Sequence, residues 1–169
     1  AELKIATDVG VATVEYLRAN LEPGARVIVN SPVYSGFYEW LKELKIEPFD
    51  VPLAHTDAGW RLDLDGLEQA FKAGHLTLLL CNPHNPVGRA FDRQELTALA
   101  ALANRYGATV ISDEIHAPLT YGEFTPYLSC GPDAEETGVV ITSSSKSFNL
   151  AGLKAALLIT QGAKMAARA

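Results

Sequence analysis

The stretch VVITSSSKSFNLAGL, residues 139–153, runs from an apolar segment into a hydroxyl-rich loop that holds one lysine. Val139 to Thr142 is short, apolar and β-branched, which predicts a buried strand, and the serines that follow predict the turn that leaves it. Lys146 therefore follows the carboxyl end of a strand. Ligands bind at that edge of open α/β sheets, so this lysine indicates covalent or phosphate chemistry, with a solvated loop lysine as the alternative.

Strand and helix patterns alternate five or six times along the chain. Apolar runs such as Leu76–Leu80 and Thr109–Ser112 predict strands, and apolar residues at helical spacing predict the helices between them. Asp92 and Glu95 form a D-x-x-E variant of the capping box for one helix, and Gly107 ends it. This alternation predicts a mostly parallel sheet covered by helices on both faces.

Four other segments give expectations that a structure can test. Ser31 and Pro32 predict the start of a helix that carries apolar residues as far as Leu44. The polar segment His55–Arg61 predicts a loop, and the segment Pro118–Pro132, which is rich in proline and glycine, predicts an irregular connection. Ala155–Thr160 predicts a last strand.

Composition limits the class of protein. A chain of 169 residues with 48% hydrophobic residues can form one domain with a sizeable core. The net charge of −6 and the lack of a basic run argue against a nucleic-acid or anionic-membrane partner. Cys81 and Cys130 form no C-x-x-C pair, which argues against a disulfide framework or a zinc site and favours a reducing cytoplasm. No signal peptide or membrane-length apolar run is found, and the start at Ala1 leads us to expect a piece of a longer protein.

Polar side chains follow three different predicted strands. Asn85 lies in the rigid, proline-rich loop Asn82–Gly88, in which Asn82 and His84 are also candidate ligand contacts or ordinary turn residues. Asp113 ends another strand, where a buried carboxylate is costly unless it has a partner or a task. The alternative is that Asp113 is a solvated helix cap. Because such loops meet at one edge of a parallel sheet, Asn85, Asp113 and Lys146 predict a single site.

These three groups match what pyridoxal phosphate needs from a protein. The lysine can supply a Schiff-base amine, the carboxylate an anionic partner for the pyridinium nitrogen, and the asparagine a donor to the ring oxygen. Four motifs then carry a family resemblance: SPVYSGF at 31–37, NPHNPVG at 82–88, SDEIH at 112–116 and SSSKSFNLAGL at 143–153. They resemble fold-type I pyridoxal-phosphate enzymes, most of all the MalY/PatB branch of cystathionine β-lyases, or C–S lyases, within the class I/II aminotransferases.

The resemblance implies a role for each matching residue. Lys146 would form the Schiff base with the cofactor and act as the catalytic base, Asp113 would pair with the ring nitrogen, and Asn85 would hydrogen-bond the ring oxygen. Tyr34 would stack on the cofactor ring, and His116 would also contact the cofactor. The cofactor phosphate would be bound by Ser143, Ser145, Lys154 and the backbone at Gly10 and Val11. Many aminotransferases have a tyrosine where this chain has His116 and an arginine where it has Lys154.

The resemblance also implies a fold, an activity and an assembly. The fold is a three-layer α/β/α arrangement on a mostly parallel seven-stranded sheet, of which residues 1–169 would be the central part of the large domain. The segment before it and the small C-terminal domain would be absent, so that apolar surface would be exposed. The implied activity is β-elimination from cystathionine or a related cysteine S-conjugate, with amino transfer to a 2-keto acid as the alternative. A small amino-acid substrate and a homodimer of the full-length protein are the implied partners.

Three other interpretations compete with this one. Ser143 and Lys146 satisfy the S-x-x-K pattern of penicillin-binding serine enzymes, although no S-D-N or K-T-G companion occurs. A non-catalytic α/β remnant that binds partners is the second. A metal site at Cys81, His84 and His116 is the third, and no ligand spacing supports it.

Overall fold

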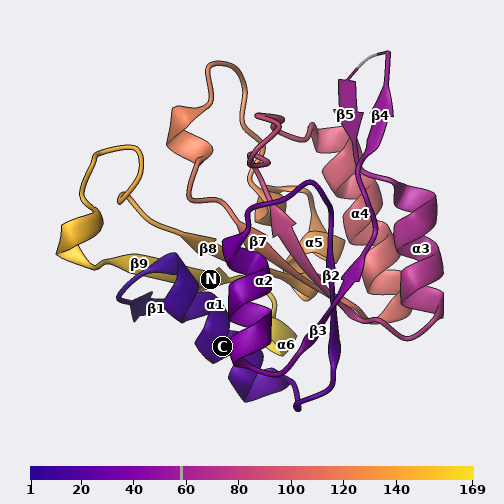
Figure 1. Ribbon diagram of the computed structural model, residues 1–169, viewed down its shortest axis with the longest axis horizontal. Coiled ribbons are helices and arrows are strands. Elements are labelled where there is room, and N and C mark those ends of the chain that lie inside the picture. Colours follow the sequence, from indigo (N-terminus) through magenta and orange to yellow (C-terminus); the bar gives the residue numbers. More distant parts are fainter. Residues whose placement is uncertain (58) are drawn as a thin grey trace.

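A computed structural model describes residues 1–57 and 59–169. Its main element is a seven-stranded sheet with the order β1-β9-β8-β7-β6-β2-β3 (Figure 1). Within the described residues β9 alone runs against the other strands of this sheet, pairing antiparallel with β8 and β1. The mostly parallel sheet predicted from the sequence is therefore confirmed. Its strands are Glu2–Ala6 (β1), Arg26–Val29 (β2), Glu47–Asp50 (β3), Thr77–Cys81 (β6), Thr109–Asp113 (β7), Gly138–Thr142 (β8) and Ala156–Thr160 (β9).

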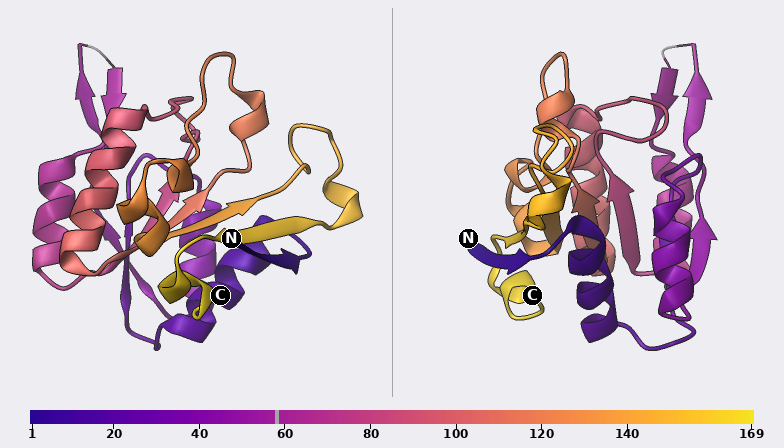
Figure 2. Two further views of the ribbon diagram at one scale, coloured as in Figure 1. Left: turned by 180° about the vertical axis from the view of Figure 1, so that it is seen from behind. Right: turned by 60° about the vertical axis from the view of Figure 1, so that its left-hand side comes forward.

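Helices cover both faces of the sheet, as Figure 2 shows. Side chains alternate across each buried strand, so Leu78 and Leu80 of β6 join the core on one face, while Leu79 and Cys81 join the core on the other. The first face packs against Leu64–Lys72 (α3), Arg93–Tyr106 (α4) and Pro132–Thr137 (α5), and the second against Val9–Asn20 (α1), Gly36–Glu43 (α2) and Ala163–Ala166 (α6). The three-layer architecture expected from the sequence is confirmed.

The ends of α4 follow the predicted capping chemistry. The Asp92 carboxylate accepts a hydrogen bond of 2.9 Å from the backbone N–H of Glu95, and the Glu95 carboxylate accepts one of 3.3 Å from that of Asp92. Gly107 closes the helix with a φ of 69°, a left-handed conformation that glycine adopts without strain. Both ends of the helix are thus fixed locally.

The start of α2 differs from the prediction, because the helix begins at Gly36 and not at Ser31 and Pro32. The backbone N–H and the hydroxyl of Ser31 both donate to the Asp50 carboxylate at the end of β3, at 3.0 and 2.6 Å. The Ser31 carbonyl accepts from the Leu53 N–H at 2.8 Å. These bonds keep Ser31 outside the helix, in a bent connection between β2 and α2, and Tyr34 precedes the helix.

The prediction of a loop at His55–Arg61 is also wrong. Ala54–Thr56 (β4) and Gly59–Arg61 (β5) pair antiparallel as a separate two-stranded sheet. The rings of His55 and Trp60 pack edge to face across it with centroids 4.6 Å apart. The Arg61 guanidinium donates to Asp92, the N-cap of α4, and to Glu95 of the same helix. Cross-strand pairing and this anchor order a polar segment that local sequence marks as a loop.

The long connection between β7 and β8 is largely irregular, as predicted. It contains two short 3-10 helices, Ala117–Leu119 (η1) and Tyr127–Ser129 (η2), and ends in α5. A third short 3-10 helix, Ala151–Leu153 (η3), lies between β8 and β9. None of the helices in the described part of the chain is long and apolar enough to cross a membrane.

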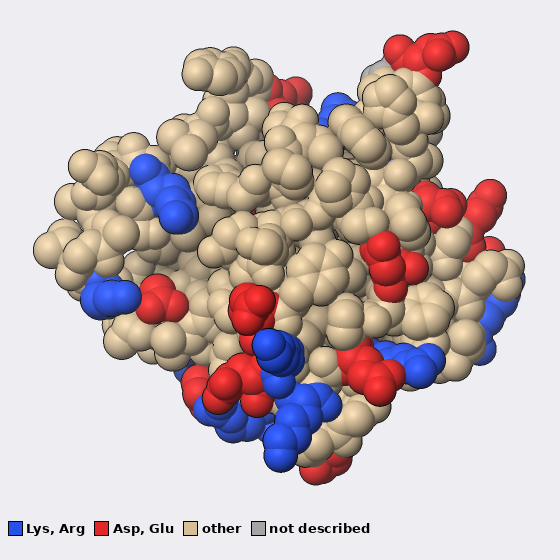
Figure 3. All heavy atoms as spheres, viewed as in Figure 1, with Lys and Arg blue, Asp and Glu red and all other residues tan. Residues whose placement is uncertain are grey.

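Apolar side chains are exposed along one flank of the sheet. Ile5 and Leu3 of β1 project into solvent, as do Phe148 and Leu153 of the loop between β8 and β9. On the face shown in Figure 3, Lys and Arg side chains alternate with Asp and Glu along the lower margin and form no basic patch, while the centre carries few charges. Exposed apolar surface of this kind is typical of a region that another part of a protein covers.

Candidate functional site

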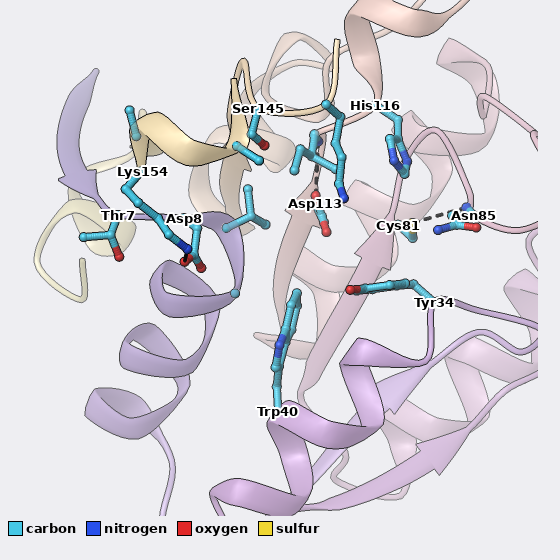
Figure 4. A pocket seen from close by; sticks show the side chains of 16 residues that line it. Thr7, Asp8, Tyr34, Trp40, Cys81, Asn85, Asp113, His116, Ser145 and Lys154 are labelled. Atoms are coloured by element: carbon cyan, nitrogen blue, oxygen red, sulfur yellow. Dashed lines mark hydrogen bonds and ion pairs between the residues drawn. The ribbon is translucent and has the colours of Figure 1, made fainter. Parts of the chain in front are cut away.

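A cavity of about 350 Å³ lies at the carboxyl edge of the parallel strands, a size typical of small-molecule sites (Figure 4). It collects side chains from the ends of β6, β7 and β8, from the start of α1 and from the segment before α2. Eight residues predicted from the sequence line it: Gly10, Tyr34, Asn85, Asp113, His116, Ser145, Lys146 and Lys154. The convergence expected of Asn85, Asp113 and Lys146 is thus present in the structure.

Asp113 is the last residue of β7 and places a buried carboxylate in the cavity. Burial raises the pKa of this group to about 6, while the Ile115 N–H, which donates to it at 3.1 Å, and the charge of Lys146 act in the opposite direction. Without a cationic ligand, the ionised Asp113 carboxylate therefore destabilises the folded chain. A protonated ring nitrogen in the cavity would be the partner that the buried charge lacks.

The loop after β6 presents Asn85 to the cavity and buries its neighbours. The Asn85 N–H donates to the Cys81 sulfur at 3.3 Å. Asn82 accepts from the Phe91 N–H at 3.1 Å and donates to the Thr125 carbonyl at 3.4 Å, and His84 Nε2 contacts the Pro32 carbonyl at 2.9 Å. Asn82 and His84 therefore fix the loop, and they lie outside the lining of the cavity.

His116 lies across the cavity from the Tyr34 side and follows β7 by three residues (Figure 4). Burial, and then the charge of Lys146, lowers its pKa, which favours the neutral imidazole at neutral pH. A neutral ring can donate or accept one hydrogen bond within the cavity. Burial, followed by the charge of Asp113, raises the pKa of the Cys81 thiol to about 12, so this cavity residue stays protonated.

The loop after β8 brings Ser145 and Lys146 into the cavity and turns Ser143 away from it. The Ser143 hydroxyl donates to the Ala155 carbonyl at 2.7 Å and accepts from the Ser145 N–H at 3.0 Å. It closes the base of the loop and does not line the cavity. The roles predicted for Ser143 and Ser145 at a phosphate group stay predictions, and Ser145 is the better placed of the two.

The start of α1 forms the opposite end of the cavity. Asp8 caps the helix, its carboxylate accepting from the Val11 N–H at 2.8 Å. Its second oxygen lies 3.4 Å from Lys154 Nζ, and Figure 4 shows this pair beside Thr7. The Val11 N–H is thus engaged by the cap, and Val11 does not line the cavity, whereas Gly10 does. The first N–H groups of a helix attract anions, and Lys154 adds a cation.

Two aromatic side chains form the floor. Tyr34, predicted to stack on a ring, reaches the cavity with a half-exposed side chain, and Trp40 of α2 stands next to it with ring centroids 5.9 Å apart. Sequence reasoning missed Trp40 and Asp8, and it considered Cys81 as a metal ligand and not as a residue of this cavity. Asp8 could have been found as an N-cap three residues before Val11. Trp40 carries no local signal, because it reaches the site only through the packing of α2 on α1.

Comparison with known proteins identifies the family. Residues 9–167 match the model of the family described as aminotransferase class I and II. The chain belongs to this family. A relative from Mycobacterium tuberculosis is 44% identical over 165 residues, which are 92% of this chain and 39% of that protein. The cystathionine beta-lyase PatB of Bacillus subtilis is 39% identical over 146 residues, covering 85% of this chain and 38% of PatB.

Solved structures of the family share the fold. Cystalysin from Treponema denticola, whose structure contains pyridoxal 5′-phosphate, superposes with a TM-score of 0.91 at 28% identity and covers 98% of this chain and 43% of its own. The family resemblance read from the four motifs is therefore confirmed. The chain spans about two fifths of the length of these relatives.

Proposed function

We propose that the protein containing this chain is a pyridoxal-phosphate-dependent carbon–sulfur β-lyase. The observation that carries the proposal is the single cavity in which the Lys146 amine, the Asp113 carboxylate and the Asn85 amide converge, in a chain of this family. Relatives named cystathionine beta-lyase support the substrate class, which is cystathionine or another cysteine S-conjugate.

The residues present fit the cofactor. The buried Asp113 carboxylate, whose pKa burial raises, suits a protonated ring nitrogen, the Asn85 and His116 side chains suit a ring oxygen, and Lys154 with the start of α1 suits a phosphate. The solved cystalysin structure contains this cofactor. When bound, pyridoxal phosphate supplies an electron sink for the bond that breaks at the substrate α-carbon.

Three residues of the cavity then have defined tasks. Lys146 binds the cofactor, and its amine, once free, removes the proton from the substrate α-carbon as a general base. Asp113 holds the ring nitrogen in its protonated form, and Tyr34 covers one face of the ring. The overall reaction converts a cysteine S-conjugate and water into pyruvate, ammonia and a thiol.

The alternative is amino transfer between an amino acid and a 2-keto acid, because the family as a whole carries that name. His116, where many aminotransferases have a tyrosine, favours the lyase. The penicillin-binding type of site is not supported, because the Ser143 hydroxyl donates to a backbone carbonyl. Within the described residues, no group of three or more His, Cys, Asp or Glu side chains is placed to hold a metal ion.

The proposal extends to the whole protein. The chain would be the central part of a cofactor-binding large domain, completed by further segments that cover the exposed apolar side chains of β1 and of the loop after β8. A homodimer in the cytoplasm is the proposed state, and a small amino acid is the proposed substrate.

Borohydride reduction of the full-length protein with bound pyridoxal phosphate, followed by peptide mapping, tests the cofactor assignment. We expect the label on Lys146, and a label on another lysine contradicts the assignment. Cystathionine, and separately an amino-acid and keto-acid pair, then test the reaction. Pyruvate and thiol released from cystathionine support the lyase, whereas keto-acid-dependent amino transfer without them supports the aminotransferase.

A further inference from the structure

Trp40 lies against the start of α1 along one edge of its indole ring. A Cβ atom built on Gly10 would lie 3.0 Å from the indole Cζ2, 3.1 Å from Cε2 and 3.2 Å from Nε1. These three atoms form the edge that carries the ring N–H. Glycine at position 10 is therefore what allows the indole to approach the first turn of the helix.

The same indole supports the aromatic floor of the cavity. Its ring centroid lies 5.9 Å from that of Tyr34 and 5.4 Å from that of Phe37, the latter fully buried in the core. Figure 4 shows the ring of Trp40 rising between the start of α1 and Tyr34. Trp40 therefore connects the residue predicted to stack on a ring with the end of the cavity predicted to take a phosphate.

Trp40 is partly exposed at the cavity, and among residues 1–57 and 59–169 no hydrogen bond is donated by its indole N–H. Tryptophan is a donor only, so an unpaired ring N–H at a ligand cavity is suited to an acceptor on a ligand. The other donors at this end are partly engaged, since Asp8 caps the Val11 N–H and lies beside Lys154. An additional neutral donor strengthens phosphate binding there without adding another charge.

We infer that Trp40 is a cofactor-binding residue whose indole N–H donates to the phosphate group of pyridoxal phosphate beside the start of α1. This inference rests on the proposed function. It adds a phosphate contact that none of the four sequence motifs predicts, and it assigns Gly10 a second task, which is to leave room for the indole.

The test compares two ligands in the full-length protein without cofactor. Pyridoxal 5′-phosphate carries the phosphate that pyridoxal lacks, and the closure of free pyridoxal to a hemiacetal is the same for every variant. The change in the ratio of the two dissociation constants between variants therefore isolates an effect on the phosphate. Trp40→Phe keeps an aromatic ring next to Tyr34 and removes the N–H. We expect this variant to raise the dissociation constant of pyridoxal 5′-phosphate by about tenfold and to leave that of pyridoxal nearly unchanged. A change of about tenfold is what the loss of one hydrogen bond to a charged acceptor produces.

Trp60→Phe is the matched control, because Trp60 lies in the β4–β5 hairpin and does not line the cavity. It should leave both constants unchanged. Equal weakening of both ligands by Trp40→Phe would overturn the inference in favour of a packing role, and so would the absence of any effect. Borohydride labelling of Lys146 in the same variants tests the proposed function separately, because it reports on the amine and not on the phosphate.

Gly10→Ala gives an independent check. The added methyl group meets the indole edge, so it should weaken the binding of pyridoxal 5′-phosphate when Trp40 is present. The same substitution should weaken binding much less in the Trp40→Phe variant, which lacks that edge. Additive effects of the two substitutions would contradict the inference.

Discussion

The two halves of the cavity differ in how firmly the fold holds them. Around Asp113 the site is built from buried residues: Asn82 is 0% and Asp113 5% exposed, and backbone groups bond both side chains. Around Lys146 the site lies on an exposed loop, in which Phe148 is 64% and Leu153 71% exposed. The sheet positions the groups that would receive the cofactor ring, whereas the amine lies on a loop that the described residues leave exposed.

This difference predicts that substitutions separate into two classes. Changes on the Lys146 side should affect function with little effect on the stability of the chain, and changes on the Asp113 side should affect both. The expected effects below run from the largest to the smallest.

Lys146→Ala should lower turnover by more than about 1000-fold, because it removes both the cofactor attachment and the proposed base. The exposed side chain contributes little packing, so the free energy of unfolding should fall by no more than about 1 kcal/mol, through the loss of the charge beside Asp113. Steady-state kinetics and urea unfolding measure the two quantities. Lys164→Ala, an exposed lysine on α6, is the control and should change neither.

Asp113→Asn should act in opposite directions on stability and on function. The buried carboxylate has a pKa of about 6, so its neutral isostere should stabilise the cofactor-free protein at pH 8 by up to about 3 kcal/mol. The same change should remove most turnover while some cofactor still binds. A variant with normal activity would show that Asp113 serves only the local turn.

The pH dependence of stability follows from two buried carboxylates. Burial raises the pKa of Asp113 to about 6 and that of Glu114 to about 7, so the folded chain binds more protons than the unfolded chain between about pH 4 and pH 7. The contribution of these two carboxylates to the free energy of unfolding of the cofactor-free protein should therefore fall as pH rises through this window and level off above it. His84 and His116, whose pKa values burial lowers, contribute a change of opposite sign at about pH 6, so the variant Glu114→Gln isolates the carboxylate contribution. Urea unfolding midpoints at a series of pH values measure it, and Glu114→Gln should flatten the slope. The same pH dependence in Glu114→Gln as in the unchanged protein would contradict the assignment.

Asn82→Ala should cost about 1 to 3 kcal/mol of unfolding free energy, because it leaves the buried Phe91 N–H and Thr125 carbonyl without their partner. Cofactor affinity should fall as well, since this loop presents Asn85. Thermal unfolding and cofactor titration report the two effects. Asn104→Ala, on the exposed side of α4, keeps the loop intact and serves as the comparison.

Phe148→Ser should have the smallest effect on the chain described here, within about 0.5 kcal/mol, because the ring is largely exposed. In the full-length protein the same change should be more costly if other segments cover this loop. The difference between the two unfolding free energies measures that coverage. Equal values would show that the loop stays exposed.

The sequence predicts the features that depend on local pattern. Alternating strands and helices, the caps at Asp92 and Gly107, and the meeting of Asn85, Asp113 and Lys146 all follow from spacing and strand ends. The β4–β5 hairpin could not be predicted in this way, because its order depends on pairing and on the contact of Arg61 with α4. Trp40 was missed for the same reason, since only the packing of two helices brings it to the cavity.

The reversed direction of β9 has a consequence for how this site can change during evolution. Because Thr142 of β8 pairs with Leu157 of β9, the intervening segment leaves the sheet and returns to it at the same edge. Insertions there would not shift the sheet register, and each doubling of loop length costs only about 0.6 kcal/mol. The segment between β8 and β9, which holds Lys146 and Lys154, can therefore change in length while the strands beneath it stay as they are.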